Sequence, residues 1–423
     1  MTHLPALKRA VAWILVAAAP ARALWFIHRY AVDVPAWDDW AYVKLAWQLP
    51  SAADLWAPHN EHRVPLPKLA MLGMHRATAL DERAGMYASW LCLLGMLAIL
   101  YVQFRRTGQG LVLFAPVSFI LFTQRQYENL LWGQGIIIAL GALCTVATFA
   151  LLDGERPRIG RAVMCAAAGS LSFASCLLIW PTGAAQLAMR ASLSREGSRR
   201  DLWIWIASGV VATALYLHGW VYPRYHPPPA RELEVVLMYF FAAFGASLSP
   251  DPTTAAATGV ILLAAAVVVF ASVSRSGLLH PHRLMPAALV VFCVFQAGLL
   301  TVGRSGFGPG QAVASRYATF ALLGVIGAWL LAAETPQTTR WGAACAGAIA
   351  ALAIVGVLVG LRDGTVHGVA TWSDRLRQAN VLATWRVQPD SALRTLFPSA
   401  EYVRAFAPEL ERRRLSVFRA ESR

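Results

Sequence analysis

Charged residues are scarce in this chain. Asp, Glu, Lys and Arg make up only 14% of its 423 residues, whereas a soluble globular domain carries about 25%. Hydrophobic residues account for 57% of the sequence, and the mean hydropathy is +0.50. This composition excludes an ordinary soluble enzyme and indicates a protein embedded in a membrane.

Cysteine and acidic residues are also sparse. The six cysteines all lie in apolar segments and form no Cys-x-x-Cys pair, so we expect small packed side chains and no thiolate metal site. The 23 acidic residues face 37 Lys and Arg, which gives a net charge of +14. Basic loops and anionic lipid explain this charge more simply than nucleic acid does, so no nucleic-acid partner is expected.

Long apolar runs recur along the chain. Residues 135–152, 255–273 and 341–360 approach or reach the roughly 20 residues that a helix needs to cross a bilayer. Residues 10–27 follow Lys8 and Arg9 but lack a good cleavage site, so we expect a retained first helix. The sequence therefore predicts an all-α, polytopic bundle of about ten to eleven spans.

The positive-inside rule assigns a side to each loop. Basic connections such as 155–161 and 190–200 are placed in the cytoplasm. A first loop at 28–84 and a polar tail at 362–423 then lie outside, with a transmembrane domain over 1–361. Two short helices are expected to meet at the Trp-Pro-Thr-Gly sequence of 180–183, and 233–250 is expected to be interfacial or re-entrant.

Two adjacent carboxylates, Asp38 and Asp39, follow the first predicted helix within the sequence Trp-Asp-Asp-Trp. Tryptophan favours the membrane interface, where a carboxylate is partly desolvated and becomes a better base. We expect one carboxylate to act as the base, with a weak preference for Asp39, which lies further from the apolar helix. The alternative is that the pair caps the following helix.

The sequence His-Asn-Glu-His-Arg follows at 59–63. His59 and His62 are three residues apart and could share one face of a helix. With Glu61 or Asp39 they could ligate a divalent metal, although a hydrogen-bonded loop explains the cluster more readily. His59, Glu61 and His62 are also expected to bind substrate. Arg63 carries a planar fork suited to phosphate.

Arg316 and Tyr317 stand at the start of an apolar run, where an arginine is costly unless it is paired. Arg304 lies at the other end of the same glycine-rich loop, so the two arginines could clamp a phosphate; the alternative is that they extend to lipid headgroups. In another outer loop, three side chains suited to sugar hydroxyls accompany Trp132: Glu128, Asn129 and Gln134.

These elements together resemble the GT-C superfamily of integral-membrane glycosyltransferases. The resemblance is carried by the acidic pair after the first helix, by the large loop of 28–84 and by the helix break near 180–183. The chain is also similar to a group of bacterial multi-pass proteins that share the Trp-Asp-Asp-Trp, Asn-Glu-His-Arg and Ser-Arg-Tyr sequences. The tail of about sixty residues departs from the larger terminal domain of many members.

The resemblance implies a glycosyltransferase in the bacterial inner membrane, with its active site on the extracytoplasmic face. The enzyme would transfer a sugar, with inversion, from a polyprenyl-phosphate carrier to a glycan, lipid or protein acceptor. Donor phosphate would meet Arg316, assisted by Arg63 or Arg304. A transporter or flippase for a lipid-linked saccharide and a polysaccharide polymerase or ligase are the alternatives, and the need for a divalent metal stays open.

Overall fold

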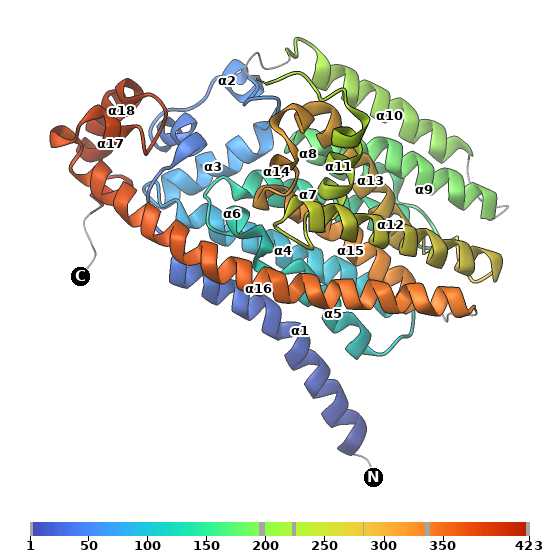
Figure 1. The fold of residues 1–423 in the computed structure, drawn as a ribbon. Coiled ribbons are helices and arrows are strands. Elements are labelled where there is room, and N and C mark those ends of the chain that lie inside the picture. Colours follow the sequence, from blue (N-terminus) through green and yellow to red (C-terminus); the bar gives the residue numbers. More distant parts are fainter. Residues whose placement is uncertain (1–2, 194–198, 222–225, 282, 335–338, 420–423) are drawn as a thin grey trace.

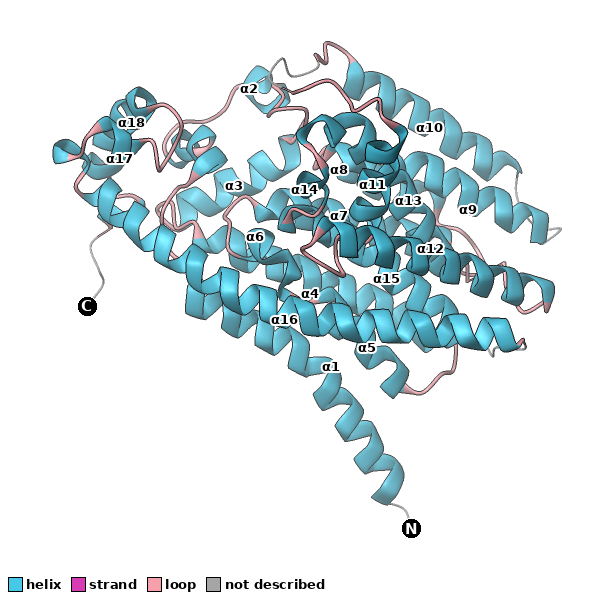
Figure 2. Ribbon diagram, in the orientation of Figure 1, coloured by secondary structure: helices cyan, strands magenta, loops and turns pink. Residues whose placement is uncertain are grey.

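The computed structural model describes residues 3–193, 199–221, 226–281, 283–334 and 339–419, and it forms helices and no strand over these ranges. Seven of the described helices are long and apolar enough to cross a membrane (Figures 1 and 2). The prediction of an all-α membrane protein is confirmed to this extent. The seven are α1 (His3–Tyr30), α4 (Arg83–Arg105), α7 (Gly135–Leu152), α12 (Pro252–Arg275), α13 (Met285–Arg304), α15 (Ser315–Glu334) and α16 (Arg340–Ala383).

The remaining helices are shorter or less apolar than these seven, which is why fewer spans meet the length criterion than the ten to eleven expected. Within the bundle they are α5 (Ala115–Leu121), α6 (Tyr127–Leu130), α8 (Ile159–Ser170), α9 (Ile179–Leu193), α10 (Arg199–Leu217), α11 (Leu233–Phe244) and α14 (Pro309–Ala312). In the first loop and near the C-terminus they are α2 (Ala52–Trp56), α3 (Pro65–Ala77), α17 (Asp390–Leu393) and α18 (Ala400–Arg412).

The helix break expected at 180–183 lies earlier in the chain. Helix α8 ends at Ser170, and α9 begins at Ile179, so Pro181 occupies the first turn of α9. Proline is tolerated there, because the first turn has no full set of intrahelical hydrogen bonds to lose. The prediction of two short helices is correct, and their junction is the segment 171–178.

Helix α16 passes close to the segment that precedes α6. At 44 residues it is about 66 Å long, roughly twice the thickness of a bilayer core. Gly360 and Gly364 face this segment, and a methyl group on either would collide with Thr123 or Gln124. Small residues four apart allow this approach, as in other packed membrane helices.

The C-terminal residues form a small folded cap instead of a loose tail. Leu393, Leu396 and Leu410 are buried in a second hydrophobic cluster with Val34 and Trp40 of the first loop. The backbone joins the same parts, because Trp37 N–H donates to the Leu396 carbonyl at 2.9 Å. The first loop and the C-terminal cap therefore lie together at one end of the bundle (Figure 1).

The expected domain boundary at 361 falls inside α16, which continues as one helix to Ala383. The polar sequence after Arg362 begins as the projecting half of this helix and ends in the cap. No change of backbone structure marks residues 361 and 362.

This arrangement makes a topological prediction. Cysteines introduced at Ser51 and Ser391, both exposed, should react with a membrane-impermeant maleimide added to intact cells. A cysteine at Gln109, an exposed position beyond the far end of α4, should react only after permeabilisation. Labelling of the unmodified chain measures the background from native cysteines. If only one of the cysteines at Ser51 and Ser391 reacted in intact cells, the two positions would not lie on the same side of the membrane, and the prediction would be wrong.

Candidate functional site

A cavity of about 290 Å³ opens where the first loop meets the ends of α7, α13 and α15. Its wall combines charged, aromatic and aliphatic side chains from segments that are far apart in the sequence. The lining residues are Trp37, Asp38, His59, Asn60, His62, Glu128, Trp132, Gln134, Ile137, Ile138, Phe173, Arg304, Arg316 and Tyr317. Nine of the twelve site residues predicted from the sequence are either in this wall or, in the case of Glu61, bonded to it.

Trp37 enters the wall in a strained backbone conformation. Its φ of +53° lies in the left-handed region, which is unfavourable for a bulky side chain. Two contacts of the ring hold it there: the Arg375 guanidinium lies 4.4 Å from its centroid, and the Trp132 ring lies edge-on with its centroid at 6.2 Å. The turn that begins at Trp37 sends the next two side chains in different directions.

Asp38 points into the cavity. Its Oδ2 lies 3.3 Å from His59 Nε2, and its side chain remains partly exposed. Burial alone would raise the pKa of Asp38, but the interaction with His59 and the positive charge of Arg316 outweigh burial and lower it. Asp38 is therefore ionised at neutral pH and is placed to accept a proton from a molecule in the cavity.

Asp39 lies outside the cavity wall. Its side chain is buried, 3% exposed, and its Oδ2 accepts a hydrogen bond from the Ala36 N–H at 3.1 Å. The reason for preferring Asp39, access from the aqueous side, is thus wrong. Burial raises the pKa of Asp39 to about 7, although Arg375 partly offsets this effect. Asp39 instead stabilises the turn locally, because its own backbone N–H also donates to the Ala36 carbonyl at 3.1 Å. The N-cap of the turn is Ala36, so neither carboxylate is the N-cap that the alternative interpretation expected.

The segment 59–62 forms a tight turn instead of a helix. His59 and His62 exchange backbone hydrogen bonds of 2.7 and 2.9 Å across it, with Asn60 at a φ of +52°. The prediction that the two histidines share a helical face is wrong. Both rings nonetheless reach the cavity wall, because the turn folds back on itself: His59 contacts Asp38, and His62 stacks on Phe173 at 4.2 Å.

Glu61 connects the turn to the membrane helices. Its carboxylate forms an ion pair with Arg304 and lies 3.3 Å from His62 Nε2 and 3.8 Å from His226 Nε2. Burial lowers the pKa of His62 to about 4, so its ring is neutral at pH 7. Because His62 Nδ1 accepts a hydrogen bond from the Ala174 N–H at 3.4 Å, its proton is assigned to Nε2, facing Glu61.

Arg63 does not line the cavity. Its side chain is buried, and its guanidinium donates to the carbonyls of Tyr216 at 2.7 Å and Trp56 at 2.8 Å. A third bond reaches the His218 carbonyl. The planar fork expected to bind phosphate instead fixes the first loop to the end of α10. This position does not support a direct contact of Arg63 with the donor.

Arg316, at the start of α15, is held in place by Glu128 of α6. The backbone N–H of Arg316 donates to Glu128 Oε2 at 2.8 Å, and the Nη1 of its guanidinium lies 3.6 Å from Glu128 Oε1. The guanidinium also lies 5.3 Å from the Tyr317 ring. The buried Asn129 donates to the Arg316 carbonyl at 2.9 Å, so it positions the arginine without lining the cavity itself.

Arg304 and Arg316 reach the same cavity from opposite ends of the glycine-rich loop, as expected. Gly308 in this loop has a φ of +87°, a conformation that L side chains rarely adopt. Gly306 packs against the Pro228 carbonyl, where a side chain would collide with backbone. Glycine is therefore favoured at Gly308 by the backbone conformation and at Gly306 by the close packing.

The sequence leaves open a divalent metal on His59 and His62 with either Glu61 or Asp39. Asp39 is buried outside the wall of the cavity that the two histidines line, whereas the Glu61 carboxylate lies 3.3 Å from His62 Nε2. Over the described residues, no group of three or more His, Cys, Asp or Glu side chains is arranged to hold a metal ion.

Sequence reasoning missed two arginines that support the site. Arg125 is buried beside Asp363 of α16, with Nη1 3.2 Å from Oδ2, and Arg375 lies on Trp37. A signal for both was present: Asp363 and Arg375 continue an apolar helix, where charged side chains need partners. Their partners, however, are more than two hundred residues away in the chain.

Comparison with known proteins adds no relative to this picture. No family model matches the chain, and neither a curated protein nor a solved structure does. The resemblance to the GT-C superfamily thus stays an inference from the residues.

The buried Asp39 predicts a pH-dependent stability. An acid whose pKa rises on folding, here from 3.8 to about 7, destabilises the folded state as pH rises through this interval and has its full effect above pH 7. Asp39→Asn removes this ionisation. Its melting temperature in detergent should therefore fall less between pH 4 and pH 7 than that of the wild type.

Asp374→Asn is the matched control, since Asp374 is exposed on α16 and should retain the wild-type pH profile. An unchanged profile in Asp39→Asn would show that Asp39 does not titrate as its burial requires.

Proposed function

We propose that the chain is a glycosyltransferase that takes a sugar from a polyprenyl-phosphate carrier and attaches it to an acceptor on the extracytoplasmic face of a bacterial inner membrane. The observation that carries the proposal is one cavity at the end of an apolar bundle that holds an ionised carboxylate, Asp38, and two arginines, Arg304 and Arg316. Transfer of a sugar from a polyprenyl phosphate needs a base that takes the proton of the acceptor and cations that stabilise the phosphate leaving group.

The arginines are assigned to the donor phosphate. Arg316 keeps 35% of its side chain exposed, and its contact with Glu128 at 3.6 Å leaves its planar fork able to bind phosphate oxygens. Arg304 lines the same cavity and is held there by its ion pair with Glu61. Ile137, Ile138 and Phe173 supply an apolar wall for the first part of the polyprenyl chain.

Asp38 is assigned to the acceptor. As the acceptor oxygen forms a bond to the anomeric carbon, its proton passes to the Asp38 carboxylate. The bond between that carbon and the phosphate oxygen breaks, and the electron pair leaves with the polyprenyl phosphate beside Arg316. Attack from the face opposite the leaving group gives inversion. His59 orients the carboxylate, and the neutral His62 extends the wall without adding charge.

The two carboxylates of the Trp-Asp-Asp-Trp turn should behave differently. Asp38→Asn keeps the size of the side chain but cannot accept a proton, so turnover should fall by about 10²–10⁴-fold while the protein inserts and binds donor. Asp39→Asn should mainly change stability, and Asp374→Asn should be silent. The readout is sugar transfer by purified protein from a panel of polyprenyl-phosphate sugars, with and without EDTA.

Turnover retained by Asp38→Asn in that assay would remove the proposed base. A catalytic loss confined to Asp39→Asn, with normal folding, would return the chemistry to the buried carboxylate. If no donor in the panel is consumed by the wild type, the transferase proposal itself fails.

The second test concerns the shape of the cation. If Arg316 binds phosphate through two parallel N–H groups, Arg316→Lys should not restore function, because lysine offers a point charge. Donor affinity, measured by titration of the purified variant, should fall by about ten-fold or more, the effect of losing one charge-assisted hydrogen bond worth roughly 1.5–3 kcal/mol. Near-normal affinity would favour simple charge attraction.

A further inference from the structure

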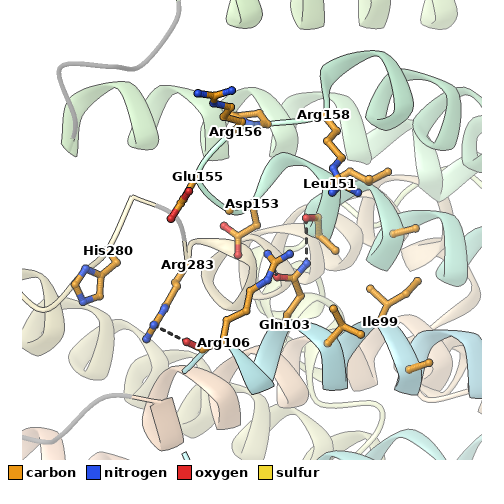
Figure 3. Close-up of a pocket in the computed structure, with 16 residues that line it drawn as sticks. Ile99, Gln103, Arg106, Leu151, Asp153, Glu155, Arg156, Arg158, His280 and Arg283 are labelled. Carbon is orange, nitrogen blue, oxygen red and sulfur yellow. Dashed lines mark hydrogen bonds between the residues drawn. The ribbon is translucent and has the colours of Figure 1, made fainter. Parts of the chain in front are cut away.

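A second and larger cavity, of about 1120 Å³, lies at the opposite end of the bundle, where α4 and α7 end. Figure 3 shows the residues that line it. Helices α4 and α7 both begin beside the first site and end here, at Arg105 and Leu152. The connection between α12 and α13 completes the wall with His280 and Arg283. This cavity shares no residue with the proposed transferase site.

The rim of the second cavity is strongly basic. Four arginines from three separate segments line it, against two carboxylates, Asp153 and Glu155. None of the four forms an ion pair within the described part of the chain. The guanidinium groups of two of them, Arg156 and Arg158, make no hydrogen bond to any described residue and are exposed. The four are Arg106, Arg156, Arg158 and Arg283.

Internal bonds fix the shape of this rim. Asp153 Oδ1 accepts the Leu284 N–H at 2.8 Å and so ties the end of α7 to the start of α13. Arg283 Nη2 donates to the Arg106 carbonyl at 2.7 Å, which ties the same region to the end of α4. Because burial raises the pKa of Asp153 to about 7, this carboxylate is only partly ionised at neutral pH and offsets little of the positive charge.

The wall that α4 and α7 form is largely apolar. Its side chains come from the last turns of the two helices, and they include the exposed Val102 and the half-buried Leu151. A dissolved anion would use only the basic rim. An amphipathic anion would use both the rim and this apolar wall, so the lining favours a molecule with a charged head and a hydrocarbon tail.

We propose that this cavity binds one anionic phospholipid, with its headgroup phosphate on the arginine rim and an acyl chain along the α4–α7 wall. Clusters of basic side chains at the cytoplasmic ends of membrane helices attract anionic headgroups at about 1 kcal/mol for each Lys or Arg. The site would bind the lipid from the leaflet opposite the proposed transfer reaction, and it does not depend on that proposal.

Arg156 and Arg158 offer a clean test, because their guanidinium groups make no hydrogen bond over the described residues that a substitution would remove. The full-length protein is purified in detergent, and its melting temperature is followed as phosphatidylglycerol, phosphatidylcholine or soluble glycerol phosphate is added. Phosphatidylglycerol alone should stabilise the wild type strongly. Arg156→Gln/Arg158→Gln should require about 25-fold more phosphatidylglycerol for half of the effect, the product of two contacts at about 1 kcal/mol each.

Arg275→Gln/Arg340→Gln is the matched control, since both arginines are exposed at the same end of the bundle and outside the cavity. It should respond to phosphatidylglycerol as the wild type does. An equal loss in the control would show general attraction to anionic surfaces and overturn the site. Equal stabilisation by phosphatidylcholine would overturn the role of charge, and equal stabilisation by glycerol phosphate would overturn the role of the acyl chain.

Discussion

The buried ion pair between Arg125 and Asp363 is the interaction on which the end of the bundle beside the first cavity depends. The Arg125 guanidinium contacts Asp363 of α16 and donates to the Val313 and Ser249 carbonyls, so it joins three connections to one helix. Burying a charge is tolerable only when it is paired and hydrogen-bonded, and removing one partner typically costs about 3–5 kcal/mol. The pair therefore fixes these segments in one arrangement.

The site inherits its geometry from that arrangement. The Ser315 hydroxyl donates a hydrogen bond to the Arg125 carbonyl at 2.9 Å, and its Oγ accepts the backbone N–H of Glu128 at 3.1 Å. Glu128 in turn holds the N–H of Arg316. A chain of hydrogen bonds thus connects the buried Arg125–Asp363 pair to Arg316, the partly exposed arginine of the cavity. These bonds fix the backbone of Arg316, which carries the flexible side chain.

The first loop reaches the cavity by a different route. Its cluster with the C-terminal cap holds Trp40 inside and leaves Trp37 in a strained conformation at the cavity wall. Glu82 lies near Asp39 beneath this turn, and burial raises the pKa of Glu82 well above its usual value. The two carboxylates of the turn consequently have different surroundings. Asp38 faces a polar cavity, whereas Asp39 lies in a buried cluster where the positive charge of Arg375 only partly offsets the acidic side chains.

By itself, the sequence determined the membrane class of the protein and the concentration of polar residues in a few segments. Low charge and long apolar runs require helices, since a lipid-exposed backbone must satisfy its own hydrogen bonds. Position along the chain also predicted Asp38, His59, Arg304 and Arg316 as site residues, because polar side chains beside apolar runs cost free energy unless they have a partner or a function.

Only the tertiary structure decided which of these side chains meet. Asp38 and Asp39 are adjacent and chemically identical, and the turn at Trp37 alone separates a cavity residue from a buried one. Arg63 has the same fork as Arg316, yet distant carbonyls of α10 and its following turn occupy it. The partners of Arg125 and Arg375 lie hundreds of residues away, and no local pattern encodes a contact whose energy depends on burial by the whole bundle.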